Sequence, residues 1–96
     1  MVKHSVRFEP GDGYRVPDRD SVGFAGTTDL GVVEFLITRD ALAEMLNPDL
    51  TSIDRETAIE TFIEFGSDIH RIGQREFVKR LGDEPPILLT LADVAG

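Results

Sequence analysis

The longest patterned stretch of this chain runs from Ser52 to Leu81 and reads SIDRETAIETFIEFGSDIHRIGQREFVKRL. At about 100° per residue, its apolar side chains fall on one half of a helical circumference and its charged side chains on the other. Ser52 or Asp54 is placed to cap the first turn, and acidic residues come early while basic residues come late, which suits the helix dipole. The pattern predicts one long helix that begins near Ser52 or Asp54 and ends near Leu81. Gly66 and Gly73 lie on its apolar half, so we expect close packing or a break there.

A shorter helix is predicted just upstream, from Arg39 to about Leu46. Thr38 is a good N-cap residue, because its hydroxyl can accept a hydrogen bond from an N–H group of the first turn. The pair Asn47-Pro48 ends this helix, since proline disfavours helical geometry in the residue before it.

Alternating apolar and polar residues predict strands around the two helices. The predicted strands are Val2–Phe8, Ser21–Thr27, Val32–Ile37 and Ile87–Thr90. We expect a loop from Pro10 to Asp20 and a half-helical turn from Leu91 to Val94. The order β-β-β-α-α-β predicts an α+β fold: one mostly antiparallel four-stranded sheet with two helices on one face, the second helix being long. The whole chain, 1–96, is expected to form a single domain.

Composition narrows the function classes. The chain has 96 residues, with 10 Lys and Arg against 18 Asp and Glu, a net charge of −8, and no cysteine. The absence of cysteine excludes disulfides, thiolate metal sites and cysteine nucleophiles. An acidic chain is repelled by phosphate backbones and anionic lipids unless its cations cluster. The start lacks the apolar core of a signal peptide, so we expect a cytoplasmic protein without a membrane partner.

Three segments and one helix pattern carry a family resemblance. The segments are Val22–Gly26, Val33–Leu42 and Ile87–Val94, and the helix between them is marked by Ala58, Phe62, Ile69 and Ile72. Together they resemble a small proteobacterial family of unknown function, domain of unknown function 1488. The resemblance extends roughly from Ser5 to Val94 and implies a compact bacterial α+β domain. It implies no catalytic residue.

The candidates for acid–base or metal chemistry are two histidines and a row of carboxylates, Glu60, Glu64 and Asp68, at i, i+4 spacing. For the row, a solvated helix face is favoured over a loosely bound divalent cation. Neither His4 nor His70 has a metal-ligand partner at helical spacing, and we expect His70 to be packed and hydrogen-bonded. We therefore assign no catalytic residue, metal ligand or cofactor, and an enzyme is the less favoured interpretation. The alternative is a small-molecule binder or enzyme that uses the loop of residues 10–20 with one of these histidines.

Four basic residues near the end of the long helix form a possible anion contact. They are Arg71, Arg75, Lys79 and Arg80. At helical spacing they are able to contact phosphates, which makes weak nucleic-acid association a further alternative. Their position is also explained by the helix dipole alone.

The apolar half of the long helix is unusually wide. A surface helix needs an apolar stripe somewhat wider than 100°, whereas this one covers about 180°. Either the short helix covers the remainder, or a patch stays exposed for another protein or a second copy. The candidate interface residues are Phe62, Phe65, Ile69 and Ile72. The favoured hypothesis is a non-enzymatic domain that docks a partner, or forms a homo-oligomer, through this flank.

Overall fold

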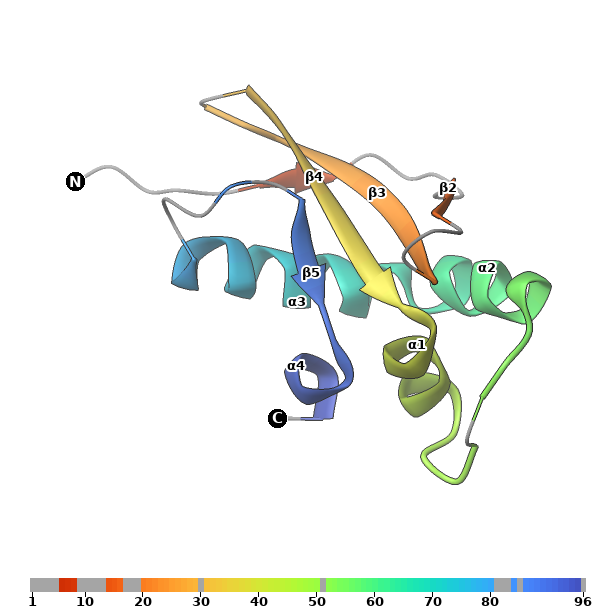
Figure 1. The fold of residues 1–96 in the computed structure, drawn as a ribbon. Coiled ribbons are helices and arrows are strands. Elements are labelled where there is room, and N and C mark those ends of the chain that lie inside the picture. The colour runs from red at the N-terminus through yellow and green to blue at the C-terminus, as the bar shows by residue number, and fades with distance from the viewer. Residues whose placement is uncertain are drawn as a thin grey trace.

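One sheet and four helices make up the fold of the computed structural model (Figure 1), which describes residues 6–8, 14–16, 20–29, 31–50, 52–80, 84 and 86–95. The elements are β1 (Arg7–Phe8), β2 (Tyr14–Val16), β3 (Ser21–Thr28), β4 (Gly31–Thr38), α1 (Arg39–Leu46), α2 (Arg55–Glu64), α3 (Gly66–Lys79), β5 (Ile87–Leu89) and α4 (Leu91–Ala95). The α+β class is as predicted, and α1 has the predicted bounds. The predicted half-helical turn near the C-terminus is the helix α4.

The sheet is mixed, which corrects the prediction of a mostly antiparallel one. β3 and β4 form an antiparallel hairpin, in which Thr28 pairs with Gly31 at the turn and Gly31 has a φ of 120° that suits glycine. β1 and β2 pair one after the other with the other edge of β3, both antiparallel. β5 pairs with β4 in parallel. The chain passes through three helices between β4 and β5, and such a crossover brings the second strand back in the same direction.

The first strand and the first loop differ from the sequence prediction. Within the described residues the first strand is only Arg7–Phe8, and the predicted positions 2–5 lie outside them. The predicted loop from Pro10 to Asp20 contains β2, a strand too short to show an alternating pattern. The sheet therefore has one more strand than the sequence predicted.

The predicted long helix is two helices, which corrects the single helix and agrees with the break that was one of two alternatives expected at its glycines. Phe65 leaves the helical geometry, with φ −101° and ψ 22°, and separates α2 from α3. The hydrogen bonds continue across it, from Phe65 N to Thr61 O and from Ile69 N to Phe65 O, so the axis kinks without a loop. A methyl group at Gly66 would meet nothing within 4 Å, so this glycine favours the kink through its low helix propensity and not through packing.

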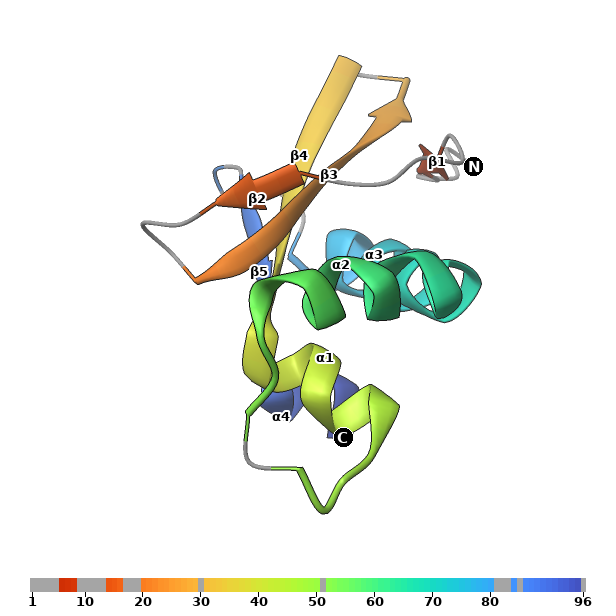
Figure 2. The same cartoon turned by 90° about the vertical axis from the view of Figure 1, so that its right-hand side faces the viewer.

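In the described part of the chain, four helices, and not two, lie against one face and one end of the sheet (Figure 2). α2 and α3 lie along one face, whereas α1 and α4 lie beyond the end of the sheet where β4 and β5 finish (Figure 2). Thr38 caps α1 as predicted, because its Oγ1 accepts a hydrogen bond from Ala41 N at 3.1 Å. No helix in the described part of the chain is long and apolar enough to cross a membrane.

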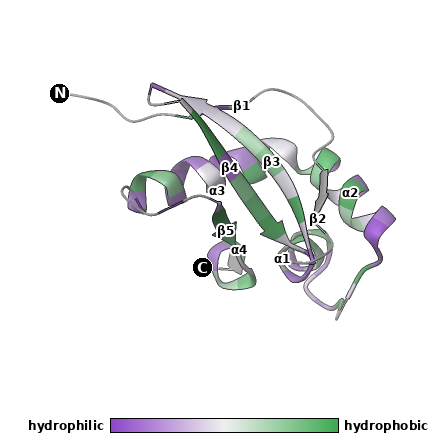
Figure 3. Cartoon of the chain, turned by 45° about the horizontal axis from the view of Figure 1, so that its top comes forward, coloured by the Kyte–Doolittle hydropathy of each residue, from purple (hydrophilic) through white to green (hydrophobic). Residues whose placement is uncertain are grey.

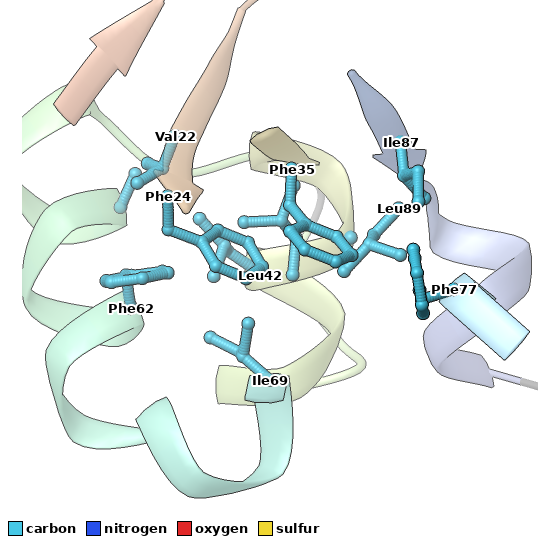
Figure 4. Close-up of a cluster of buried hydrophobic side chains, with 12 residues drawn as sticks. Val22, Phe24, Phe35, Leu42, Phe62, Ile69, Phe77, Ile87 and Leu89 are labelled. Atoms are coloured by element: carbon cyan, nitrogen blue, oxygen red, sulfur yellow. The ribbon is translucent and has the colours of Figure 1, made fainter. Parts of the chain in front are cut away.

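The hydrophobic core lies between the sheet and these helices. β4 and β5 are apolar over most of their length (Figure 3), and side chains from the sheet and the helices converge on one cluster (Figure 4). Its members are Val22, Phe24, Phe35, Ile37, Ala41, Leu42, Ala58, Phe62, Ile69, Phe77, Ile87 and Leu89.

Candidate functional site

An open groove lies where α1 faces the kink and the first half of α3. Its apolar lining is Met45 from α1, Phe65 from the kink and Ile72 from α3, and all three side chains are half-buried. Its charged lining is Asp68, Arg71 and Arg75, which are exposed. The volume is about 370 Å³. We call it the α1–α3 groove, and it combines an apolar centre with a charged rim.

The kink and the cap place the apolar side chains of this groove. Phe65 lies at the break between α2 and α3, where it packs against the core and lines the groove, while Phe62 and Ile69 on either side of it are buried in the core. Met45 is held in place by α1, whose start is fixed by the Thr38 cap. The sequence pattern could place Met45 on the apolar side of the short helix. It could not predict the role of Met45 in the groove, because that role depends on contacts between helices.

The structure divides the four residues of the predicted interface. Phe62 and Ile69 are 2% and 0% exposed, so a folded protomer does not present them to a partner. Phe65 and Ile72 are half-buried and line the groove. Phe62 packs against Phe24 of β3, so the sheet covers part of the wide apolar flank, and the α1–α3 groove is open beside it.

The four basic residues of the predicted anion contact are engaged with acidic side chains. Arg71 Nη2 lies 2.8 Å from Asp68 Oδ1, an exposed pair on one helix face. Arg75 and Lys79 lie 3.0 Å and 3.5 Å from a carboxylate oxygen of Glu76. Arg80 is described below. These charges are largely neutralised within the chain, which weakens the case for a phosphate backbone as ligand.

Glu76 is the centre of an ion cluster that the sequence prediction missed. Its side chain is 2% exposed, and its carboxylate accepts hydrogen bonds from Arg75 Nε and Arg80 Nε. Burial alone raises the pKa of this carboxyl, but the hydrogen bonds from Arg75 and Arg80 outweigh burial and lower the pKa. The signal was present in the sequence: Glu76 is one, three and four residues from three cations.

Arg80 joins this cluster to the C-terminal segment. Its Nη2 lies 3.0 Å from both carboxylate oxygens of Asp93, and its Nη1 donates to Leu88 O at 2.8 Å. Asp93 also accepts from Thr90 N at 2.8 Å, which ties the first turn of α4 together. Burial raises the pKa of Asp93, but the bonds from Thr90 and Arg80 lower it overall. The cluster thus fixes β5 and α4 against the end of α3.

The alternative of a ligand site or active site built on a histidine depends on His70, and the structure shows this side chain packed against Phe8. The ring of His70 stacks on Phe8 with centroids 4.4 Å apart and planes 5° from parallel, and burial lowers its pKa. His70 lines neither the α1–α3 groove nor a hollow beside β1. His4 and most of the loop of residues 10–20 lie outside the described residues. Among the residues that are described, no three His, Asp or Glu side chains are grouped closely enough to hold a metal ion.

Comparisons with known proteins support the fold. The sequence matches no protein-family model and no curated protein. Among solved structures, the chain is similar to a crystal structure of a protein of unknown function from the DUF1488 family of Shewanella loihica PV-4. The two share 13% sequence identity and a TM-score of 0.68, and the match covers 94% of each chain. The chain thus has the fold of a DUF1488-family protein, as its sequence resemblance implied.

Proposed function

We propose that this chain is a non-enzymatic protein-docking domain whose binding surface is the α1–α3 groove. The observation that carries the proposal is the open apolar centre formed by Met45, Phe65 and Ile72, whose half-buried side chains lie against the buried core. The occupant we propose is a short segment of another protein that inserts large apolar side chains between α1 and α3.

The distribution of polar groups favours a peptide segment over a small polar ligand. Small-molecule sites place a few polar groups inside the pocket to orient the ligand. The polar side chains of this groove are Asp68, Arg71 and Arg75, and all three are exposed at its rim. An apolar centre with a polar rim is the usual anatomy of a protein interface.

The rim also offers hydrogen bonds to a partner. The side chain of Arg71 is 77% exposed, and a guanidinium carries five N–H donors. Its described bond, to Asp68, leaves donors for backbone carbonyls or carboxylates of the inserted segment. We therefore expect selected ligands to pair apolar side chains with a nearby acceptor group.

Selection from a displayed library of random short peptides tests the proposal. Peptides selected on the full chain should be rich in large apolar residues and should bind the Ile72→Asp variant at least about tenfold more weakly, a loss of about 1.4 kcal/mol. Ile63→Asp is the matched control, because Ile63 is 51% exposed on α2 and does not line the groove. It should leave the affinity unchanged.

Three outcomes would contradict the proposal. They are no enriched peptide, an affinity for Ile72→Asp equal to that for the wild type, and an equal loss of affinity in Ile72→Asp and Ile63→Asp. Circular dichroism must show that each variant is folded, and Ile72→Thr serves as a milder change should the aspartate unfold the chain. Sedimentation of the wild type tests whether a second copy is the occupant. A dimer that Ile72→Asp disperses and Ile63→Asp keeps would assign the groove to self-association.

A further inference from the structure

The two arginines on the rim of the α1–α3 groove are held in different ways. Arg75 Nε donates to Glu76 Oε2 at 3.0 Å, and Arg75 Nη2 donates to the carbonyl oxygen of Asp93 at 2.6 Å. The described bond of Arg71 is to Asp68 on the same helix face, and the side chain of Arg71 is 77% exposed against 47% for Arg75. Arg75 therefore has a fixed orientation in the groove, whereas Arg71 is held by a surface ion pair.

The helix α4 supplies one of the two acceptors that orient Arg75. This helix has five residues, too few for a stable isolated helix, so its position depends on packing and on side-chain bonds. It packs on α1, the helix that brings Met45 to the groove (Figure 1). The Asp93 side chain accepts hydrogen bonds from Arg80 Nη2 and Thr90 N. These bonds fix the residue whose carbonyl oxygen receives Arg75.

The ion cluster that contains Arg75 carries an excess of positive charge. It joins three cations and two carboxylates, which are Arg75, Lys79, Arg80, Glu76 and Asp93. At the end of the groove nearer the kink, the charges of Arg71 and Asp68 balance each other. Although the chain as a whole has a net charge of −8, the Arg75 end of this groove is thus complementary to an anionic group.

Arg75 also keeps donors for such a group. A guanidinium has five N–H donors in a planar fork, and the described bonds of Arg75 use Nε and one N–H of Nη2. The fork matches the two oxygens of a carboxylate, and a charge-assisted bond is stronger than a neutral one. Because the guanidinium is already oriented, little conformational entropy is lost when it binds.

We propose that Arg75 is the residue that selects the occupant of the α1–α3 groove, by pairing with a carboxylate of the inserted segment. This inference rests on the proposed docking function and adds the chemistry of the partner: an apolar segment that carries an Asp or Glu beside its apolar anchor. Arg71 is left to backbone carbonyls, which every peptide offers.

Paired peptides test the inference. Peptides selected on the full chain should contain Asp or Glu more often than the unselected library does. One selected peptide is then synthesised in two forms, one with its acidic residue and one with the corresponding amide, Asn or Gln. The wild type should bind the acidic form about fivefold more tightly, which is the upper range for an exposed ion pair and below that for a buried one.

Three variants locate the preference for the acidic form. Arg75→Gln should bind the two forms equally. Arg75→Lys keeps a positive charge beside Glu76 but loses the planar fork, so the preference should fall to about twofold. Arg71→Gln is the matched control, the same change about one helical turn away on the same rim, and it should keep the fivefold preference.

Four results would overturn the inference: equal binding of the two forms by the wild type, a preference kept in Arg75→Gln, a full preference in Arg75→Lys, or a preference lost in Arg71→Gln. Circular dichroism must show that each variant is folded. A peptide that loses affinity for Ile72→Asp but binds equally in its acidic and amide forms would overturn this inference and leave the docking function standing. No enriched peptide would contradict both.

Discussion

The two apolar sides of α3 differ in how far other elements cover them. The side that faces the sheet carries Ile69, Gly73 and Phe77, and it is closed by the strands and by the inserted ring of Phe8. The side that faces α1 carries Ile72 and begins at Phe65, and these side chains stay half-buried and line the open groove together with Met45. The residue types on the two sides are alike. What differs is how fully the neighbouring elements cover them, so an apolar stripe alone does not say which part of it is core.

The largest expected effect contrasts the same substitution on the two sides of this helix. Ile69→Ala removes a side chain that is 0% exposed, and it should lower the free energy of unfolding by about 3 kcal/mol, within the usual range for core truncations. Ile72→Ala removes a half-buried side chain beside open space, and it should cost below about 1 kcal/mol. Chemical denaturation of both variants measures the difference. Equal losses would mean that the groove side is core as well.

The next effect compares a buried carboxylate of α3, Glu76, with an exposed one, Asp68. Glu76→Gln leaves Arg75 and Arg80 without their shared carboxylate, and we expect a loss of about 2 kcal/mol, between the values for exposed and buried ion pairs. Asp68→Asn breaks an exposed pair at the groove rim and should cost about 0.5 kcal/mol or less. Denaturation at low and high salt distinguishes them. A Glu76→Gln variant as stable as Asp68→Asn would contradict the role of the cluster.

Local signals were readable from the sequence, and contacts between distant segments were not. Thr38 and the residues after it predicted α1 with its bounds, because capping depends on neighbours in the chain. Gly66 signalled a possible break in the long helix, but which of its two glycines marks the break, and the parallel pairing of β5, depend on how helices and strands meet. The three cations around Glu76 were a local signal that the prediction missed, whereas the link through Arg80 to Asp93 depends on how α4 packs against α3.

The same distinction holds for the candidate site. The wide apolar arc predicted all four residues as a possible interface, but it could not separate Phe65 and Ile72, which line the groove, from Phe62 and Ile69 in the core. Periodicity predicts where side chains lie around one helix axis, but it does not predict which elements pack against them. The glycine at position 73 was a better guide, since it marked a close approach.

A smaller effect tests the wall of the groove. Thr38→Ala removes the hydrogen bond from Ala41 N to the Thr38 hydroxyl and should lower the free energy of unfolding by about 1 kcal/mol. Since α1 supplies Met45, amide hydrogen exchange in α1 should increase more than exchange in α3. Equal increases in both helices would show that α1 is not a separately anchored wall.

The smallest effect is a pH dependence of the free energy of unfolding, and it comes from His70 on the side of α3 that faces the sheet. Burial lowers the pKa of His70 below its ordinary value of 6.5, so the unfolded chain takes up the proton first as the pH falls. His70 should leave stability intact above pH 6.5 and reduce it as the pH falls from 6.5 to the folded-state pKa. His70→Phe keeps a ring beside Phe8 and should remove this dependence. Below that window, stability should fall further as Glu76 and Asp93, whose pKa values are lowered, take up protons.

The most direct measurement of the docking proposal is the affinity of one selected peptide for three proteins: the wild type, Ile72→Asp and Ile63→Asp. Both changes place a carboxylate on the α2–α3 helix pair, one in the groove and one outside it. The account predicts a dissociation constant at least about tenfold higher for Ile72→Asp and unchanged for Ile63→Asp. Equal dissociation constants for the two folded variants would contradict it.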